Sequence, residues 1–196
     1  MKGQRGIFIR GRFAMMAGVI AGLIASNHNA FPGTLNVKGS GSETGGTTYF
    51  SFDGASHPGN PTGAASQLLL TGTDNIGGRF TGQNTAEYTL DFSKSCTAPN
   101  GTTGVAVELV EAVEAVTYKQ GQLYSSAEGP TSGCASFDGS FTETETHTVT
   151  GGTGKFSNAS GSITLTITGR ILSAPASPGF GTFGAAAIAE TGSVTD

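Results

Sequence analysis

The stretch GGTGKFSNASGSITLTITG, residues 151–169, decides which kind of fold this chain adopts. Its glycines and Lys155 fit either a phosphate-binding loop or the turn that precedes a β-strand. A phosphate-binding P-loop needs Gly-Lys-Ser/Thr at the start of a helix. Here Phe156 follows Lys155, and the residues after it alternate like a strand. The stretch therefore predicts a structural corner in a β-protein, and not a nucleotide site.

A second segment has the same pattern as this corner. Residues 78–82, GRFTG, and residues 154–158, GKFSN, both read glycine, base, Phe, hydroxyl residue and turn residue, and each leads into a predicted strand. Glycine supplies a positive φ or a close approach, Phe fills apolar space, and a long base such as Lys155 stays at the solvent rim. We therefore predict that the corners depend on three structural residues, Gly154, Phe156 and Phe80.

The run SITLTIT at 162–168 is the clearest strand, because Ile163, Leu165 and Ile167 share one face and threonines the other. Turn residues separate further short segments with β-branched residues. Short, evenly spaced strands predict an all-β sandwich or barrel of about eight antiparallel strands. The candidate strands are residues 34–40, 47–53, 66–73, 85–93, 116–126, 141–150, 162–172 and 182–194.

Residues 105–116, VAVELVEAVEAV, are ambiguous between a strand and a helix. Glu108, Glu111 and Glu114 recur every third residue, which on a helix forms one acidic stripe. The segment has no good N-cap and is rich in Val. The sequence favours an irregular strand with a bulge, and a short helix covering a barrel end stays the alternative.

Residues 1–30 have the pattern of a secretory signal. Basic residues between Lys2 and Arg12 precede an apolar run from Phe13 to Ala25. This run is shorter than the about 18 residues typical of a bilayer span, so we expect cleavage between residues 25 and 30 and no membrane span afterwards. Residues 31–196 then form a single domain, which is secreted, periplasmic or located at the cell surface.

Charge and cysteine content narrow the classes of function. Beyond Ser26 the chain has fourteen acidic and six basic residues, a net charge of −8, which excludes a nucleic-acid-binding surface. Cys96 and Cys134 predict one disulfide in an exported protein, with two buried thiols as the alternative. No second cysteine pair completes a metal site, and Asp74-Asn75 favours an ordinary turn over a calcium site. The sequence predicts no metal and no cofactor.

Candidate catalytic residues are scarce. His57 follows Ser56 in a loop rich in Pro and Gly, and no Gly-x-Ser-x-Gly motif is present. In the alternating run 141–149, Glu143, Glu145 and His147 share one face. Burying carboxylates without partners is unfavourable, so this pattern favours an exposed outer face. The alternative is that the three side chains line the interior and bind a ligand. We assign no catalytic residue.

The segment VTGGTGKFSNASGSITLTITG, residues 149–169, resembles a corner and its following strand in the allene oxide cyclase/dirigent superfamily, whose dirigent-like members carry a GGTGKF segment between two late strands. The resemblance implies an eight-stranded antiparallel barrel with a central cavity. The acidic and basic interior residues of that family cannot be placed on this chain, because no motif outside the corner aligns with it.

These observations lead to one favoured function and two alternatives. The favoured hypothesis is a secreted β-barrel without enzymatic activity that binds one small apolar ligand, since an eight-stranded barrel has room for about one small molecule. The first alternative is an enzyme of the cyclase/dirigent kind that steers a lipophilic intermediate. The second is a cell-surface interaction protein. The lining of the interior separates these hypotheses.

Overall fold

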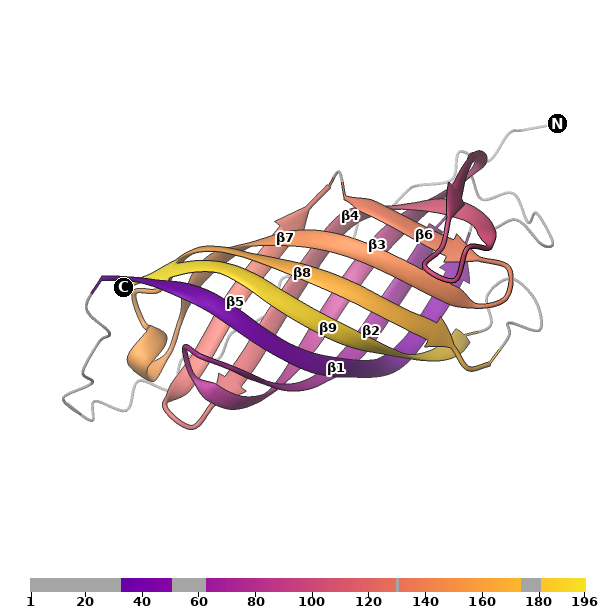
Figure 1. The fold of residues 1–196 in the computed structure, drawn as a ribbon. Helices are drawn as coiled ribbons and strands as arrows, with labels where there is room; N and C mark the ends of the chain where they lie inside the picture. The colour runs from indigo at the N-terminus through magenta and orange to yellow at the C-terminus, as the bar shows by residue number, and fades with distance from the viewer. Residues whose placement is uncertain (1–32, 51–62, 130, 174–180) are drawn as a thin grey trace, which may run out of the picture.

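The computed structural model describes residues 33–50, 63–129, 131–173 and 181–196; the predicted signal segment and His57 lie outside them. The described residues form one antiparallel sheet that closes into a ring (Figure 1), which confirms the all-β prediction. The one helical segment among them is the single-turn 3₁₀ helix η1 (Gly154–Phe156). The strands are β1 (Thr34–Phe50), β2 (Gly63–Asp74), β3 (Gly78–Thr97), β4 (Thr103–Tyr118), β5 (Gly121–Glu128), β6 (Ser132–Ser136), β7 (Ser140–Gly152), β8 (Ser160–Ile171) and β9 (Gly181–Thr195).

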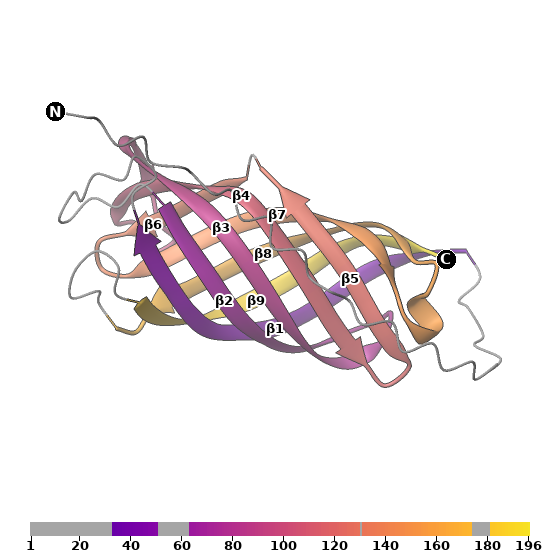
Figure 2. The ribbon, with the colours of Figure 1, turned by 180° about the vertical axis from the view of Figure 1, so that it is seen from behind.

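Pairing between β3 and β4 closes the ring. Strand β1 pairs with β2 on one side and with β9 on the other, so the first and last strands are neighbours. Strands β5 and β6 share one position between β4 and β7, because β5 pairs with residues 111–118 of β4 and β6 with residues 104–107. The strands run obliquely to the long axis of the ring (Figure 2). The ring therefore has eight positions around its circumference.

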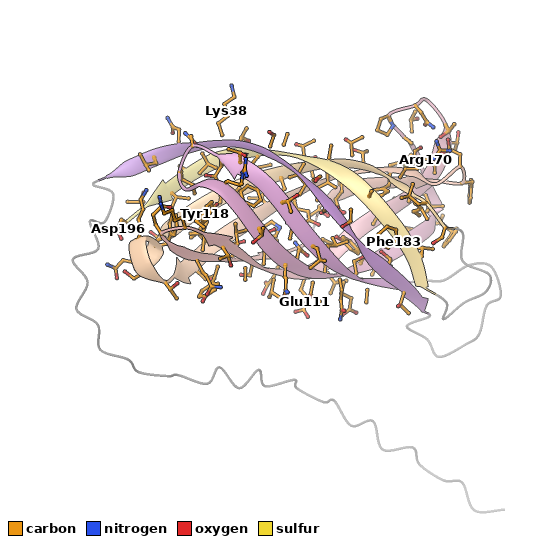
Figure 3. All side chains as sticks on the ribbon, turned by 90° about the horizontal axis from the view of Figure 1, so that it is seen from below. Lys38, Glu111, Tyr118, Arg170, Phe183 and Asp196 are labelled. Atoms are coloured by element: carbon orange, nitrogen blue, oxygen red, sulfur yellow. A yellow bond between two sulfur atoms is a disulfide. The ribbon has the colours of Figure 1, made fainter. Side chains whose placement is uncertain are left out.

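The two ends of the ring differ in their connections. We call one the corner end: it carries the turns at 75–77 and 119–120, η1, and the chain's C-terminus (Figure 1). We call the other the loop end: it carries the connections at 98–102 and 137–139. In Figure 3, Tyr118 and Asp196 lie near the corner end, and Arg170 and Phe183 lie near the loop end.

Strand β8 shows how the alternating sequence becomes a two-faced wall. Ile163, Leu165 and Ile167 are buried inside the ring, and Thr166 and Thr168 are exposed, as predicted. Burying an aliphatic side chain contributes about 1.5–3 kcal/mol. These residues belong to a core that fills the corner end and the middle of the ring, with the large members Leu70, Phe80, Tyr118, Leu123, Phe156 and Ile188.

The predicted corner residues have the expected roles. Gly154 has φ +59°, and a Cβ there would lie 2.2 Å from the carbonyl oxygen of Gln120. Phe156 is fully buried, and its ring centroid lies 5.0 Å from that of Tyr118. Phe80 of the second corner is also buried, and its ring centroid lies 5.8 Å from that of Tyr118. The two similar corners therefore meet at one tyrosine.

The prediction that Lys155 stays at the solvent rim is wrong. Lys155 is half-buried, and its Nζ donates a hydrogen bond of 2.9 Å to the carbonyl oxygen of Ile76. Its Nζ also lies 5.7 Å from the Phe156 ring centroid. The reason is that the β2–β3 turn packs beside the β7–β8 corner, so the lysine joins two connections.

Several predicted strand boundaries need correction. Residues 34–40 and the described part of 47–53 are one strand, β1, because the glycines between them allow close strand approach: a Cβ at Gly45 would lie 2.0 Å from the carbonyl oxygen of Gln67. Residues 116–126 are two strands, β4 and β5, joined at Lys119 and Gln120. Strand β6 was not predicted.

The ambiguous segment 105–116 is a strand with a bulge, as the sequence favoured. Glu87 of β3 pairs with Glu111, and the next residue, Tyr88, pairs with Leu109, so Val110 is the extra residue. A bulge changes which face the following residues occupy. Consequently Glu111 is exposed, and Glu114, three residues later, is turned toward the interior and partly buried.

The predicted disulfide between Cys96 and Cys134 is confirmed, with an S–S distance of 2.02 Å and a Cα–Cα distance of 5.8 Å. Both cysteines lie in strands, β3 and β6. The two strands flank the start of β4, where Gly104 pairs with Cys96 on one side and Ser136 on the other. The bridge therefore joins β3 to β6 across β4 at the loop end.

Candidate functional site

The acidic face of β7 lies inside the ring, so the favoured prediction of an outer face is wrong. The side chains of Glu143, Glu145 and His147 are 7 %, 1 % and 1 % exposed. In the register with β8, Glu145 pairs with Leu165 and His147 pairs with Ile163, both of which are buried. The threonines between them face solvent. The structure thus supports the alternative position that the sequence left open.

Hydrogen bonds join this face to strands on both sides of the ring. The Tyr88 hydroxyl donates to Glu145 Oε1 at 3.0 Å, and His147 Nε2 lies 2.8 Å from Glu145 Oε2. His147 Nδ1 lies 3.2 Å from Ser125 Oγ. Glu145 thus holds a tyrosine and a histidine at once. Hydrogen bonds of this kind are stronger in a buried site than in water.

Three further carboxyl groups interact with Glu145, two of them from other strands. We call these residues the inner acid cluster: Glu43 of β1, Glu114 of β4, and Glu143 and Glu145 of β7. Burial, and then the charges of Glu145 and Glu114, raises the pKa of Glu43 to about 7. Burial also raises the pKa of Glu114, although His147 and a hydrogen bond from Asn84 oppose this. Burial and the charge of Glu145 raise the pKa of Glu143 well above its usual value.

His147 is the basic residue of the site, and carboxyl groups surround it. Burial lowers the pKa of His147, but the hydrogen bond to Glu145 and the charges of Glu114 and Glu145 outweigh burial and raise it overall. Burial is also the first cause that raises the pKa of the Tyr88 hydroxyl. The site therefore combines Glu43, Glu114 and Glu143, whose pKa values are raised, with a tyrosine donor and a histidine whose pKa is also raised.

Two buried oxygen atoms at this site have no hydrogen-bond partner among the described residues. They are Glu143 Oε1 and Asn84 Oδ1, on side chains that are 7 % and 4 % exposed. The amide nitrogen of Asn84 lies 3.4 Å from Glu114 Oε2, so the free amide oxygen belongs to the same cluster. Buried polar atoms are almost always paired with protein or water. Each of these two acceptors therefore lacks a donor.

Small side chains surround these polar groups toward the loop end. We call them the alanine cluster: Ala64, Ala86, Ala112 and Ala127, which pack with Tyr88 and Leu109. They alternate with the polar residues on the same inward face, since Ala86 lies between Asn84 and Tyr88, and Ala112 precedes Glu114 by two residues. The inner acid cluster thus has the alanine cluster on one side and the large side chains of β8, Ile163, Leu165 and Ile167, on the other.

A second acidic group lies apart from this cluster, at the corner end. Asp74 Oδ1 accepts the backbone N–H groups of Ile76 and Gly77, and its Oδ2 accepts the Tyr118 hydroxyl. Burial, then the charges of Asp74 and Glu114, raises the pKa of Glu190 to about 8. These contacts confirm an ordinary turn at Asp74-Asn75, which stabilises the β2–β3 connection.

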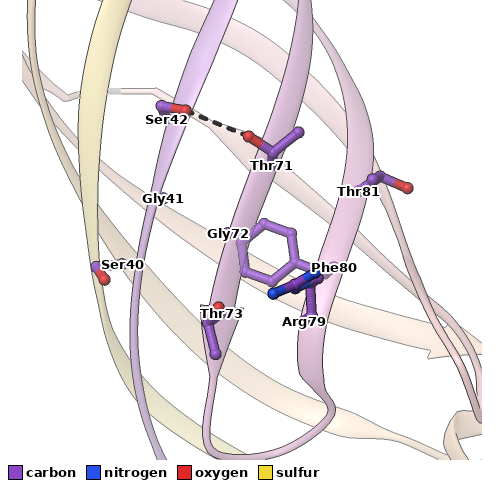
Figure 4. Close-up of a pocket in the computed structure, with 9 residues that line it drawn as sticks. All are labelled: Ser40, Gly41, Ser42, Thr71, Gly72, Thr73, Arg79, Phe80 and Thr81. Carbon is purple, nitrogen blue, oxygen red and sulfur yellow. Dashed lines mark hydrogen bonds between the residues drawn. The ribbon is translucent and has the colours of Figure 1, made fainter.

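A shallow depression lies on the outer surface of β1, β2 and β3 (Figure 4). Hydroxyl groups, Arg79 and the backbone of Gly41 and Gly72 line it. A Cβ at Gly72 would lie 2.4 Å from Cζ of Phe80, so the glycine makes room for this ring. The depression therefore follows from core packing and has no converging polar groups.

Sequence reasoning proposed only the β7 residues of this site. Tyr88, Asn84, Glu43, Glu114 and Ser125 were missed, because their shared position depends on how five strands are arranged around the ring. In the described part of the chain, no three His, Cys, Asp or Glu side chains are arranged to hold a metal ion, and no helix there is long and apolar enough to cross a membrane. Comparison with protein-family models and with curated proteins finds no match for this chain.

Proposed function

We propose that this chain is a secreted binding protein without enzymatic activity, which holds one small, largely apolar molecule inside the ring. The observation that carries the proposal is the pair of unpartnered buried oxygens, Glu143 Oε1 and Asn84 Oδ1, beside the alanine cluster. A ring of eight positions is filled by large side chains or leaves room for one small molecule. Alanine in place of leucine or phenylalanine favours the second case.

The same proposal assigns the ring to the β-barrels of the allene oxide cyclase/dirigent kind. Its support is the antiparallel ring with eight positions and the corner at residues 151–156, with a positive φ at Gly154 and a buried Phe156. Export is supported by the segment 1–30 and by the Cys96–Cys134 bridge, because disulfides persist in oxidising compartments. Cell fractionation tests export: processed protein outside the cytoplasm supports it, and full-length cytosolic protein contradicts it.

Ligand binding is tested with Nile red, a neutral dye whose fluorescence rises in apolar surroundings. We expect the protein to bind the dye with a stoichiometry of about one. Ala86→Leu fills the interior, and its neighbour Thr85→Leu adds the same side chain to the exposed outer face. Overpacking a core costs about 1–3 kcal/mol, so thermal melts must show that both variants are folded.

The expected result is a loss of dye affinity of at least about tenfold in Ala86→Leu and no change in Thr85→Leu. Equal affinity in the two variants places the dye on the outer surface and contradicts the proposal. Absence of dye binding by the parent protein contradicts it as well.

A second candidate function is an enzyme that steers a lipophilic intermediate. The observation that favours it is the buried chain Tyr88–Glu145–His147–Ser125, since a carboxyl and an imidazole in contact can donate and accept protons. Styrene oxide, a small lipophilic epoxide, is a suitable probe. Ring opening above the buffer rate that is lost in His147→Gln, while dye binding persists, supports an enzyme. A rate equal to that of buffer alone contradicts it.

A further inference from the structure

The balance of charge inside the ring indicates what kind of molecule fits there. The carboxyl groups that act on one another come from strands β1, β4, β7 and β9. The charges that act on Glu43, Glu143 and Glu190 are those of other carboxyls, and for Glu114 the one positive charge among its causes is His147. Lys155 Nζ is bound at the Ile76 carbonyl, at the corner end. Carboxyl groups therefore outnumber basic groups at the site.

The unpartnered atoms add an observation that does not depend on charge. Both Glu143 Oε1 and Asn84 Oδ1 are oxygens that can accept a hydrogen bond, and the amide oxygen of asparagine cannot donate one. A buried acceptor left without a donor is unfavourable. The site therefore needs a group that brings several N–H or O–H donors, and a positive charge on that group would balance the carboxyls.

The apolar walls limit the rest of the molecule. The alanine cluster packs the methyl groups of Ala86 and Ala112 with the Leu109 side chain and the ring of Tyr88, and Ala86 lies two residues from Asn84 on the same face of β3. The Tyr88 hydroxyl is occupied by Glu145, so the tyrosine presents its ring to the alanine cluster. An ammonium group has three donors and one positive charge, and an attached hydrocarbon body fits the alanine cluster.

We propose that the interior site binds a small primary ammonium ion with an apolar body, whose nitrogen donates to Glu143 Oε1. This inference rests on the proposed binding function and names its ligand class. The bound cation favours the ionised carboxyl groups of the inner acid cluster, so binding at neutral pH releases a proton. The release comes from carboxyls that hold a proton in the empty site, of which Glu43, with a pKa of about 7, is the nearest to neutrality.

The test uses three probes with the same six-carbon body: hexylammonium, hexan-1-ol and hexanoate. Isothermal titration calorimetry on the full chain at pH 7 measures each affinity, in phosphate and in MOPS buffer, because the difference in heat between buffers counts released protons. Tris is avoided, since it is itself a primary amine. We expect hexylammonium to bind at least about tenfold more tightly than hexan-1-ol, and hexanoate to bind more weakly than both.

Two variants test the assigned residues. Glu143→Gln removes an ionisable carboxyl group inside the ring, and Glu111→Gln removes one from the exposed face of β4. We expect Glu143→Gln to lower the affinity for hexylammonium at least about tenfold and to leave hexan-1-ol unchanged, and Glu111→Gln to leave both unchanged. The affinity of the parent protein for hexylammonium is expected to fall as pH drops from 7 to 5, because the carboxyls take up protons.

The results separate this inference from the proposed function. Equal binding of hexan-1-ol and hexylammonium, with no buffer dependence of the heat, overturns the ammonium inference and leaves a site for apolar molecules. If millimolar CaCl₂ displaces hexylammonium in proportion to the calcium bound, the site binds a metal ion and the ammonium inference is overturned. If neither Nile red nor any of the three probes binds, both the inference and the proposed function are wrong. If Glu143→Gln does not fold, the affinities of the parent protein for the three probes still decide whether the ammonium inference holds.

Discussion

At the scale of single residues, the corner end depends on Phe156. Its side chain is fully buried against Tyr118 at the point where the two similar corners meet. We predict that Phe156→Ala lowers the free energy of unfolding by about 3–5 kcal/mol, because it leaves a cavity that neighbouring rings cannot fill. Urea denaturation measures this change, and a loss below about 1 kcal/mol would mean that the corner collapses around the smaller side chain.

Lys155 next to it has a smaller and different role. Its Nζ satisfies the Ile76 carbonyl, so we predict that Lys155→Ala costs about 1 kcal/mol, the usual contribution of one hydrogen bond. The matched control is Lys119→Ala, which removes an exposed lysine at the same end of the ring and should stay within about 0.5 kcal/mol of the parent. Equal effects of the two substitutions would show that the Lys155 contact contributes nothing.

Glu145 is the residue whose loss we expect to be most disruptive inside the ring. It accepts from Tyr88 and holds His147, and all three are buried. We predict that Glu145→Ala costs about 3–5 kcal/mol, because it leaves a buried histidine and a hydroxyl without their acceptor. Glu111→Ala on the outer face is the control. If denaturation shows the same small change for both, the buried network does not stabilise the fold.

The position of Glu145 was open to prediction from residues close to it in the sequence. Every second residue from Phe141 to Val149 lies on the same face of the strand, which places Glu143, Glu145 and His147 on the face of Val149. Val149 is buried. An alternating strand that ends in an apolar residue carries its neighbours at every second position to the same face. The cost of burying carboxyl groups favoured the outer face instead, and this prediction was wrong. The partners that β3 and β5 supply inside the ring cannot be recognised in the β7 sequence.

At the scale of elements, the disulfide controls the loop end. Cys96 of β3 and Cys134 of β6 are 38 residues apart in the chain, and the bridge joins strands that are not directly paired. Closing a loop of this length contributes roughly 4 kcal/mol in the chain-entropy model. We predict that dithiothreitol lowers the melting temperature by about 10 °C.

The double variant Cys96→Ser with Cys134→Ser separates this effect from other actions of the reductant. It should melt near the temperature of the reduced parent and should not respond to dithiothreitol. Two free thiols in a non-reducing mass measurement of the exported protein would contradict the bridge.

Elements with a strong local signal were predicted well, and elements defined by their partners were not. Strand β8 follows from its alternating Ile, Leu and Thr, and the corner before it from Gly154 and Phe156. A bulged strand at residues 105–116 was favoured because the segment is rich in Val and has no good N-cap, although the extra residue, Val110, is defined only by the register with β3. Strand β6 is short and shares a ring position with β5, and nothing in its own five residues indicates this.

At the scale of the whole molecule, the interior contains more carboxyl groups than it can ionise. Glu43 and Glu190 have a raised pKa, about 7 and about 8, because burial favours their neutral form. They hold a proton in the folded state over a pH range in which the unfolded chain, with a carboxyl pKa of 4.5, releases it. When the folded state binds more protons, stability falls as pH rises. The molecule is therefore built to be most stable in mild acid.

The range of this effect follows from the pKa values. The contribution of each raised carboxyl is complete below pH 4.5 and is lost up to about pH 7 for Glu43 and about pH 8 for Glu190, at up to about 1.4 kcal/mol per pH unit for each group. His147, whose pKa is also raised, changes in the same direction. The pKa of Asp91 is lowered chiefly by its hydrogen bond with Ser93, and that of Asp138 chiefly by its hydrogen bond with Ser136. The contribution of these two groups to stability is therefore lost only below about pH 4.

We therefore predict that the melting temperature is highest near pH 5 and falls by about 10 °C or more on going to pH 8. The double variant Glu43→Gln with Glu190→Gln replaces both carboxyls by amides that do not titrate, so its melting temperature should depend much less on pH and should exceed that of the parent at pH 8. Scanning calorimetry from pH 4 to 9 measures both proteins. A parent melting temperature that rises from pH 5 to pH 8 would show that these carboxyls are ionised in the folded protein, with a cation held among them even when none is added.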